Sequence, residues 1–162
     1  MHGNGKLYYA NGKLAYEGEW YMDEFHGFGK VFNDNCLIQE EMFDYRDFNQ
    51  LDEQWQYYEG SLVSDSKEGF GKIVLGNGEH YEGYFSSDRL NGEGKFTRKD
   101  GEVIQGIWKD SVLEKVLWID FFYIININAE YHIFFLELRI VSFSLPEPFL
   151  ELADKVFSMV EL

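Results

Sequence analysis

The sequence predicts a mostly β chain in which repeated β-hairpins pair edge to edge as one elongated, single-sheet antiparallel meander. The first observation behind this prediction is a Tyr-x-Gly step, or an Ile-x-Gly variant of it, that recurs 23 residues apart in the later units. A fixed period of about 20 to 50 residues is the signature of a repeat architecture. The steps begin at Tyr16, Tyr58, Tyr81 and Ile104.

Two further elements recur in phase with these steps. Gly-x-Gly-Lys steps begin at Gly3, Gly27, Gly69 and Gly92. Turn dipeptides of the Asn-Gly or Asp-Gly type begin at Asn11, Asn77 and Asp100, with Asp34-Asn35 in the equivalent place. Such dipeptides are the strongest short hairpin signals. Each unit is therefore predicted to be two short strands, with a tight Asn-Gly turn leading into the next unit.

The alternation of side chains along a strand gives each unit one apolar face and one polar, solvent-exposed face. Tyr16, Gly18 and Trp20 point one way, while Glu17 and Glu19 point the other. Glycine normally weakens a strand interior, so we expect these glycines to leave space for a neighbouring ring to lie flat. The glycines predicted to be structural are Gly18, Gly27, Gly29, Gly60, Gly69, Gly71, Gly83, Gly92, Gly94 and Gly106.

The run Tyr16-Glu17-Gly18-Glu19-Trp20, followed by Gly27-Phe28-Gly29-Lys30, resembles the MORN repeat, and the residues from Tyr81 to Gly101 resemble it equally. The resemblance covers about residues 1–111, and the first copy is only a second half. The pattern degenerates over 33–56, which is either an eroded repeat or an insertion. Leu62 stands where the family has an aromatic residue. Because the chain begins within a repeat, its first strand either adds to another sheet or marks a truncated start.

The 16 glycines all lie before residue 107, so a different structure is expected afterwards. Residues 112–145 are rich in β-branched and aromatic residues, which predicts an apolar, strand-rich extension. Exposed strands of this kind would aggregate, so we expect them to pack on the sheet, on a second copy or, as we favour, in an interface. Residues 146–162 are predicted to form an amphipathic C-terminal helix. Its apolar face would comprise Leu150, Ala153, Val156, Phe157 and Val160.

Composition and charge exclude several functions. A chain of 162 residues fits one ordinary domain, and a formal net charge of -15 repels phosphate backbones, so we expect no nucleic-acid binding. Cys36 is the sole cysteine, which excludes an internal disulfide and favours a reducing, cytoplasmic compartment. The apolar stretch after Val112 is interrupted by charges and falls short of the ~18 residues of a membrane span, so we expect a soluble chain.

Catalytic and cofactor signatures are also missing from the sequence. No Gly-x-Gly-x-x-Gly, no Walker-type Gly-Lys-Ser/Thr and no Gly-x-Ser-x-Gly step is present. The four histidines, His2, His26, His80 and His132, do not cluster in the sequence. We therefore predict no enzyme, no metal site and no cofactor.

The segment from Glu40 to Glu59 combines acidic residues with aromatic ones. It has no glycine before Gly60, which disfavours a calcium loop, so its carboxylates are interpreted as a solvated face. Its aromatic residues could dock on a basic, apolar partner. They are Phe43, Tyr45, Phe48, Trp55 and Tyr57.

Two functional hypotheses follow. In the first, the chain is a non-catalytic scaffold whose aromatic face holds a helix or an extended segment of another protein, because aromatic residues dominate such interfaces. The predicted partner-binding residues are Tyr16, Trp20, Tyr58, Tyr81, Phe85 and Trp108. The partners would be other proteins of a larger assembly, with a second copy of the chain as a further candidate.

The resemblance implies a place in a ciliary, axonemal or radial-spoke assembly, or elsewhere in the cytoskeleton, since MORN proteins often serve there. The second hypothesis is a membrane-associated module that binds phospholipid or regulates another domain, as MORN repeats do beside phosphoinositide kinases. The acidity of the chain weighs against this alternative, because phosphoinositide headgroups attract clustered Lys and Arg.

Overall fold

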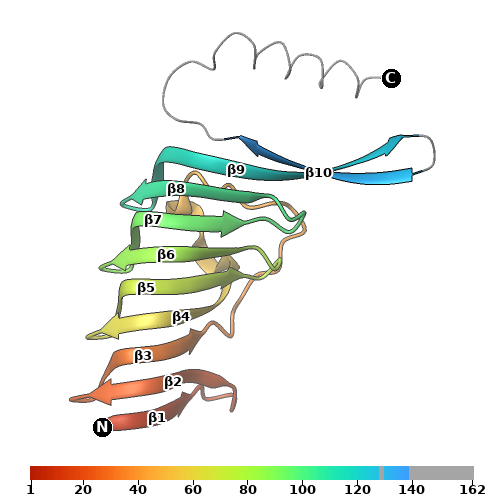
Figure 1. The fold of residues 1–162 in the computed structure, drawn as a ribbon. Coiled ribbons are helices and arrows are strands. Elements are labelled where there is room, and N and C mark those ends of the chain that lie inside the picture. The colour runs from red at the N-terminus through yellow and green to blue at the C-terminus, as the bar shows by residue number, and fades with distance from the viewer. Residues whose placement is uncertain (128–129, 139–162) are drawn as a thin grey trace.

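A computed structural model describes the backbone of residues 1–127 and 130–138, and the side chains of residues 1–117. It shows a single open antiparallel sheet of ten strands whose spatial order is the order of the sequence (Figure 1). The predicted β-meander is thus confirmed. The strands are β1 (Gly3–Tyr8), β2 (Leu14–Tyr21), β3 (Glu24–Phe32), β4 (Trp55–Val63), β5 (Ser66–Leu75), β6 (His80–Ser86), β7 (Arg89–Thr97), β8 (Val103–Lys109), β9 (Val112–Ile127) and β10 (Glu130–Leu138).

Strand β9 is the longest of the described strands, and it pairs with β8 on one side and β10 on the other over different parts of its length. Its first half pairs with β8 as far as Asp120, and its second half pairs with β10 from Ile119 onward. The helix predicted over 146–162 and the last residues of the predicted extension, 139–145, lie outside the described residues. So do the side chains on which the expected packing of this extension depends. None of the helices in the described part of the chain is long and apolar enough to cross a membrane.

The tightest turns are not the ones that the sequence analysis selected. Two-residue turns join β2 to β3, β4 to β5, β6 to β7 and β8 to β9, and both central residues of each have positive φ. This is the type I′ geometry that matches the twist of paired strands. Their central residues are Met22-Asp23, Ser64-Asp65, Ser87-Asp88 and Asp110-Ser111.

The Asn-Gly and Asp-Gly dipeptides lie in longer loops, at the ends of the strands opposite to these two-residue turns. Gly12, Gly78 and Gly101 have φ of 83°, 90° and 92°, so these positions do need glycine. However, each loop holds more than two residues, as between Leu75 and His80. Each dipeptide still closes a hydrogen-bonded turn into the next unit, because the N–H of Gly12, Gly78 and Gly101 donates to the carbonyl three residues earlier. The predicted turns between units are thus confirmed, and the additional two-residue turns join the two strands of one hairpin.

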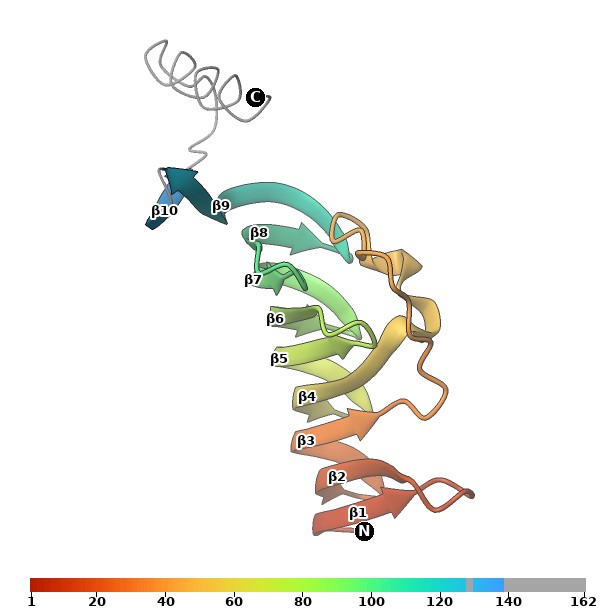
Figure 2. The same cartoon turned by 90° about the vertical axis from the view of Figure 1, so that its right-hand side faces the viewer.

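Residues 33–54 are an insertion that adds no strand to the sheet. Strands β3 and β4, on either side of it, pair directly with each other, and Gly29 is opposite Gly60. The insertion carries two short 3-10 turns, η1 (Phe48–Gln50) and η2 (Asp52–Gln54). Figure 2 shows it leaving the end of β3 and running beside the later strands as far as β9.

The core lies on one face of the sheet, called here the inner face. One row of side chains crosses it from strand to strand through direct pairing, and most of the row is fully buried. The opposite, outer face carries the charged side chains. The inner row comprises Tyr16, Val31, Tyr58, Ile73, Tyr81, Phe96 and Ile104.

Candidate partner-binding face

A continuous row of glycines crosses the sheet beside this aromatic row. Each glycine is paired with the glycine of the next strand, from Gly5 on β1 to Gly106 on β8, where Val116 of β9 ends the row. The pairing passes through β3 and β4 without interruption, although the insertion separates these strands in sequence. The row comprises Gly5, Gly18, Gly29, Gly60, Gly71, Gly83, Gly94 and Gly106.

The glycine row exists because tyrosine rings lie on it. A Cβ built on Gly29 would approach the ring carbon Cε2 of Tyr16 to 2.5 Å, and one on Gly71 would approach Cε2 of Tyr58 to the same distance. Real side chains do not tolerate such contacts. The expectation that the glycines leave space for a flat ring therefore describes what the structure shows at Gly18, Gly29, Gly60, Gly71, Gly83 and Gly94.

The remaining predicted glycines have other reasons. Gly27, Gly69 and Gly92 have φ of 64°, 78° and 123°, which L side chains rarely adopt. Gly106 is crowded by Leu113 of the neighbouring strand instead of by a tyrosine, because Ile104 replaces the ring in this unit.

Each tyrosine hydroxyl also satisfies a backbone group at the end of its own ring. Tyr16 and Tyr58 donate to the carbonyls three residues ahead, those of Glu19 at 2.7 Å and Ser61 at 2.8 Å, beside bulges in the strand pairing. Burial raises the pKa of Tyr16 to about 12, with the charge of Glu19 adding to it. Burial likewise raises the pKa of Tyr58 and of Tyr81 well above the ordinary value.

The six residues predicted to bind a partner all lie on the inner face, but they belong to the core of the chain. Tyr16, Tyr58 and Tyr81 are fully buried, and the most exposed of the six, Trp20, is 8% exposed. The other two are Phe85 and Trp108. Their burial corrects the expectation of an open aromatic surface, because these rings pack on glycines and on each other. Whether a partner contacts them is untested, so their binding role stays a prediction.

The insertion covers the inner face over β6 to β9. Phe48 packs against Tyr81 and Phe96 with ring centroids 5.6 and 5.7 Å apart, and Tyr45 stacks on Phe96 at 5.7 Å. Phe43 and Phe48 are 6% and 5% exposed. Thus these aromatic residues, interpreted as free to dock on a partner, dock on the chain's own sheet.

Polar contacts fix the insertion in this position. The buried carboxylate of Glu79 accepts a hydrogen bond from the backbone N–H of Phe43 at 2.7 Å. The indole Nε1–H of Trp108 donates to the carbonyl of Tyr45 at 3.0 Å, and the N–H of Phe48 donates to the carbonyl of Ser111 at 2.8 Å. The inner face therefore already holds one irregular peptide segment through aromatic anchors and backbone hydrogen bonds.

The acidic residues of the insertion lie mainly at its surface, as the solvated-face interpretation expects. Two of them also organise the segment locally. Asp44 pairs with Arg46 at 2.7 Å, and Asp47 accepts the N–H of Asn49 at the start of η1. The pKa of Asp44 is lowered by its hydrogen bond to Arg46, and that of Asp47 by its hydrogen bond to the Asn49 backbone.

The inner face over β1 to β3 carries a small aromatic cluster. Tyr16 stacks on Phe25 with ring centroids 3.8 Å apart, and Trp20 meets Phe25 edge-on at 4.9 Å. Leu7 is directly opposite Tyr16 and is 44% exposed. In Figure 2 the insertion lies beside β4 to β9 and leaves β1 and β2 clear.

The structure also reveals a ladder of turn residues that sequence reasoning missed. The N–H of Asp65 donates to the Phe25 carbonyl, and the Asp65 carboxylate accepts the Phe25 N–H at 2.7 Å. Asp88 makes the same pair of contacts with Lys67. Ser111 does so with Leu90. The signal was available, since Asp65, Asp88 and Ser111 are 23 residues apart like the tyrosines.

The outer face carries an alternating ladder of lysines and glutamates. Directly paired positions run from Lys6 to Lys95, and adjacent members form ion pairs, as between Lys72 and Glu82 at 2.8 Å. The pKa of Glu82 is lowered by its hydrogen bond to Lys72 and by the charge of Lys95. The ladder comprises Lys6, Glu17, Lys30, Glu59, Lys72, Glu82 and Lys95.

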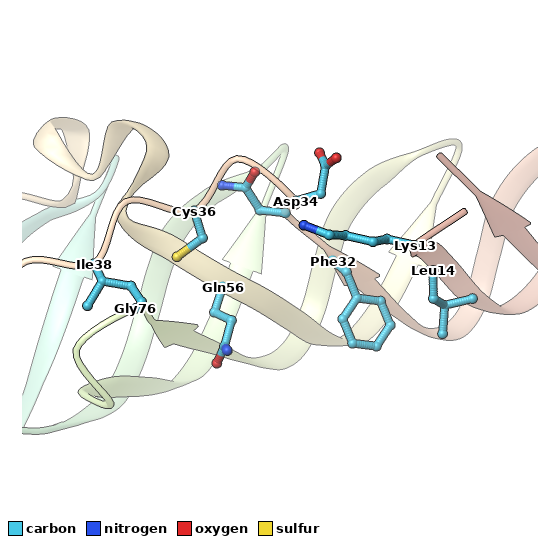
Figure 3. A pocket seen from close by; sticks show the side chains of 9 residues that line it. Lys13, Leu14, Phe32, Asp34, Cys36, Ile38, Gln56 and Gly76 are labelled. Carbon is cyan, nitrogen blue, oxygen red and sulfur yellow. The ribbon is translucent and has the colours of Figure 1, made fainter. Parts of the chain in front are cut away.

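A pocket of about 400 Å³ lies where the insertion leaves the sheet (Figure 3). Lys13 and Asp34 stand at one side of it, and Cys36 lies near Gly76 at the other. Burial raises the pKa of the Cys36 thiol, which favours the protonated form. The pocket is open and combines scattered polar groups without a buried charge, so its residues give no indication of a ligand.

The three histidines whose side chains the structure describes contact aromatic rings or charged neighbours. His2 and His26 both pack on Tyr21, at 5.4 and 5.5 Å. Burial lowers the pKa of His80, and the charge of Lys72 adds to this effect. Within the residues that the structure describes, no three His, Cys, Asp or Glu side chains gather as metal ligands would.

These features define a repeat protein whose hairpin units share one glycine row and one aromatic row. The family model of the MORN repeat matches the chain over residues 1–13, 16–36, 58–80 and 81–103. The chain is a member of the MORN-repeat family. Three of the matched segments begin at Tyr16, Tyr58 and Tyr81, the rings that cover the glycine row, and residues 37–57, which include most of the insertion, are unmatched.

A search of curated proteins gave no match to the chain. MORN repeats are non-catalytic modules that serve as scaffolds and bind proteins or lipids.

Proposed function

We propose that this chain is a non-catalytic scaffold that binds a protein partner on the inner face of its MORN sheet. The observation that carries the proposal is the docked insertion. Aromatic side chains of residues 43–48 fill the face over β6 to β9, and backbone groups of the same segment bond to Trp108 and Ser111. A face that binds an irregular segment of its own chain has the chemistry to bind another.

The part of the face that a partner would use lies over β1 to β3. Leu7 is 44% exposed and the ring of Phe25 is half-buried, beside the nearly buried Trp20. Aromatic and aliphatic anchors of this kind, framed by polar residues, are typical of protein interfaces. The partners we expect are components of a larger cytoplasmic assembly, of the cytoskeleton or of a cilium.

The charges of the outer face disfavour the alternative function, binding of phospholipid. Lys6, Lys30 and Lys72 each pair with a glutamate of the ladder, at 2.9, 3.2 and 2.8 Å. Anionic headgroups attract clusters of basic side chains, and here each positive charge has a negative neighbour. Co-sedimentation with phosphoinositide vesicles at physiological salt tests this alternative, and pelleting of the chain would support lipid binding.

The test of the scaffold uses two matched charge substitutions. Leu7→Glu places a carboxylate on the inner face, and Phe28→Glu places one at a residue of the outer face that is 58% exposed. Tagged wild-type and variant chains are expressed in a ciliated cell, and their co-purifying proteins are quantified by mass spectrometry. We expect a defined set of cytoskeletal or ciliary proteins to be lost with Leu7→Glu and retained with Phe28→Glu.

Circular dichroism of both variants checks that the sheet is intact. Loss of the same proteins with Phe28→Glu alone would indicate that the partner binds the outer face instead of the inner face. Unchanged recovery with both variants would contradict binding at either surface.

A further inference from the structure

We propose that the indole N–H of Trp20 binds a backbone carbonyl of the partner, in an irregular segment flanked by aromatic side chains. This inference rests on the proposed function and specifies the chemistry of the ligand. The segment would lie over β1 to β3 as residues 43–48 lie over β6 to β9.

Trp20 and Trp108 occupy the same position of their units. Trp20 follows Tyr16 and Gly18 on β2, and Trp108 follows Ile104 and Gly106 on β8, with identical spacing. Both side chains lie on the inner face and are buried, at 8% and 1% exposure. Leu62 and Phe85 fill this position in the two units between them, and neither side chain can donate a hydrogen bond.

The two indoles differ in what they bond to. Trp108 Nε1–H donates to the carbonyl of Tyr45 in the insertion at 3.0 Å. Trp20 Nε1 is also buried but has no hydrogen-bond partner among the residues that the structure describes. Buried polar groups are nearly always bonded, so an orphaned donor needs an explanation. At Trp108 the docked segment provides the acceptor, and at Trp20 we infer that a bound partner provides it.

An acceptor would reach Trp20 Nε1 by displacing the side chain of Met1. Its Nε1 lies over Gly5, where a built Cβ would be 2.9 Å away, and the terminal methyl of Met1 lies over the same glycine. Met1 is 52% exposed, and its unbranched side chain can swing aside when a ligand arrives. Phe25 and Leu7 then offer the apolar contacts that Phe96 and Tyr81 offer to the insertion.

The ligand chemistry follows from the insertion itself. Phe43, Tyr45 and Phe48 supply rings two and three residues apart, and the Tyr45 carbonyl between them accepts the indole hydrogen bond. The probe is therefore a capped synthetic peptide, MFDYRDFN, that copies residues 42–49. It is titrated into the full chain labelled with ¹⁵N, and the indole N–H resonances are followed.

Trp20→Phe assigns the Trp20 resonance and removes the donor while keeping an aromatic ring. Trp55→Phe is the matched control at a half-buried tryptophan away from β1 and β2. We expect the Trp20 resonance to move downfield as the peptide binds. Trp20→Phe should weaken the peptide about three- to tenfold, as the loss of one hydrogen bond implies, while Trp55→Phe leaves it unchanged.

Three results would overturn the inference. In the first, the Trp108 resonance moves and the Trp20 resonance does not, which would mean that the peptide displaces the insertion. In the second, the Trp20→Phe chain binds the peptide as tightly as the wild type does. In the third, no binding is seen at millimolar peptide. The proposed function is judged separately by partner recovery. Loss of partners with Leu7→Glu but full recovery with Trp20→Phe would keep the scaffold and discard the role of the indole.

Discussion

The phenol ring of Tyr58 lies over Gly71 of the neighbouring strand, so closely that a Cβ there would come within 2.5 Å of its Cε2. The same relationship joins Tyr16 to Gly29 and recurs at Tyr81. The ring can lie flat on the sheet only because two paired glycines leave the backbone bare beneath it. Sequence and sheet register are therefore coupled in every unit that has this tyrosine.

Gly71→Ala is expected to lower the free energy of unfolding by about 1–3 kcal/mol, the usual cost of overpacking a core. The φ of Gly71 is not in the left-handed region, so the cost comes from the ring of Tyr58. Urea unfolding measures it, with Lys72→Ala on the outer face as the control. In a Tyr58→Leu background the alanine should cost clearly less, and an undiminished cost would contradict the ring as its cause.

Phe48→Ala should detach the insertion from the inner face. The ring is 5% exposed and contacts Tyr81, Phe96 and Trp108, so its loss is expected to cost about 3–5 kcal/mol. Limited proteolysis should then cut within residues 33–54 much faster, while the β-sheet signal in circular dichroism persists. Leu37→Ala, at a residue of the insertion that is 56% exposed, should change neither reading. Equal proteolysis of the two variants would argue against a docking role for Phe48.

Asp88 links one hairpin to the next, and its carboxylate should stabilise the fold above acid pH. Burial works to raise the pKa of Asp88, but the hydrogen bond from the Lys67 backbone and the charge of Lys67 outweigh it and leave the pKa lowered. A lowered folded-state pKa gives stability that is present above the ordinary pKa of about 4 and is lost as pH falls through the folded value.

Asp88→Asn keeps a residue that tolerates positive φ but removes this titration. We expect it to lower stability by less than about 1 kcal/mol at pH 7, because the carboxylate is half exposed, and to flatten the loss of stability in acid. Thermal melts from pH 2 to 7 measure both effects. Asp110→Asn serves as control, since its carboxylate faces Arg89 at 3.6 Å in solvent. A variant whose acid profile matched the wild type would exclude Asp88 as a contributor.

Tyr16 should contribute to alkaline unfolding. Its folded pKa is raised to about 12 by burial, so its stabilising effect is complete below the unfolded pKa near 10 and is lost as pH rises through about 12. Tyr16→Phe removes the hydrogen bond to the Glu19 carbonyl and should cost about 0.5–1.5 kcal/mol at pH 7. It should also make stability fall less steeply between pH 10 and 12. Phenolate absorbance, followed together with circular dichroism, tests both expectations.

The repeat array could be predicted because its signals are local and periodic. The alternation of Tyr81, Gly83 and Phe85 within one strand fixes which side chains share a face, and the 23-residue period fixes which strands pair. The turn at Ser87-Asp88 follows the same period but was not predicted, because Ser-Asp lacks the glycine of the strongest hairpin signals although both of its residues have positive φ.

The course of the insertion could not be read in the same way. Phe43, Tyr45 and Phe48 follow neither the strand period nor the helix period, and their contacts with Phe96 and Trp108 reach 48 to 63 residues ahead. Their burial covers the inner face over β6 to β8 and leaves the part over β1 and β2 uncovered. The burial of Glu79 and its hydrogen bond to Phe43 could not be predicted either, since a single acidic residue after an Asn-Gly turn follows no pattern.

The direct pairing of Gly29 with Gly60 separates the frame of this molecule from the segment that the frame carries. The paired residues of β3 and β4 all lie outside residues 33–54, and loop closure becomes less favourable only slowly with length. We expect a different sequence placed between Phe32 and Trp55 to keep this pairing if it restores the aromatic contacts that Phe43 and Phe48 make with the inner face. The segment between β3 and β4 is thus a site for engineering, at which the peptide over β6 to β9 can be exchanged while the paired residues of the repeats are kept.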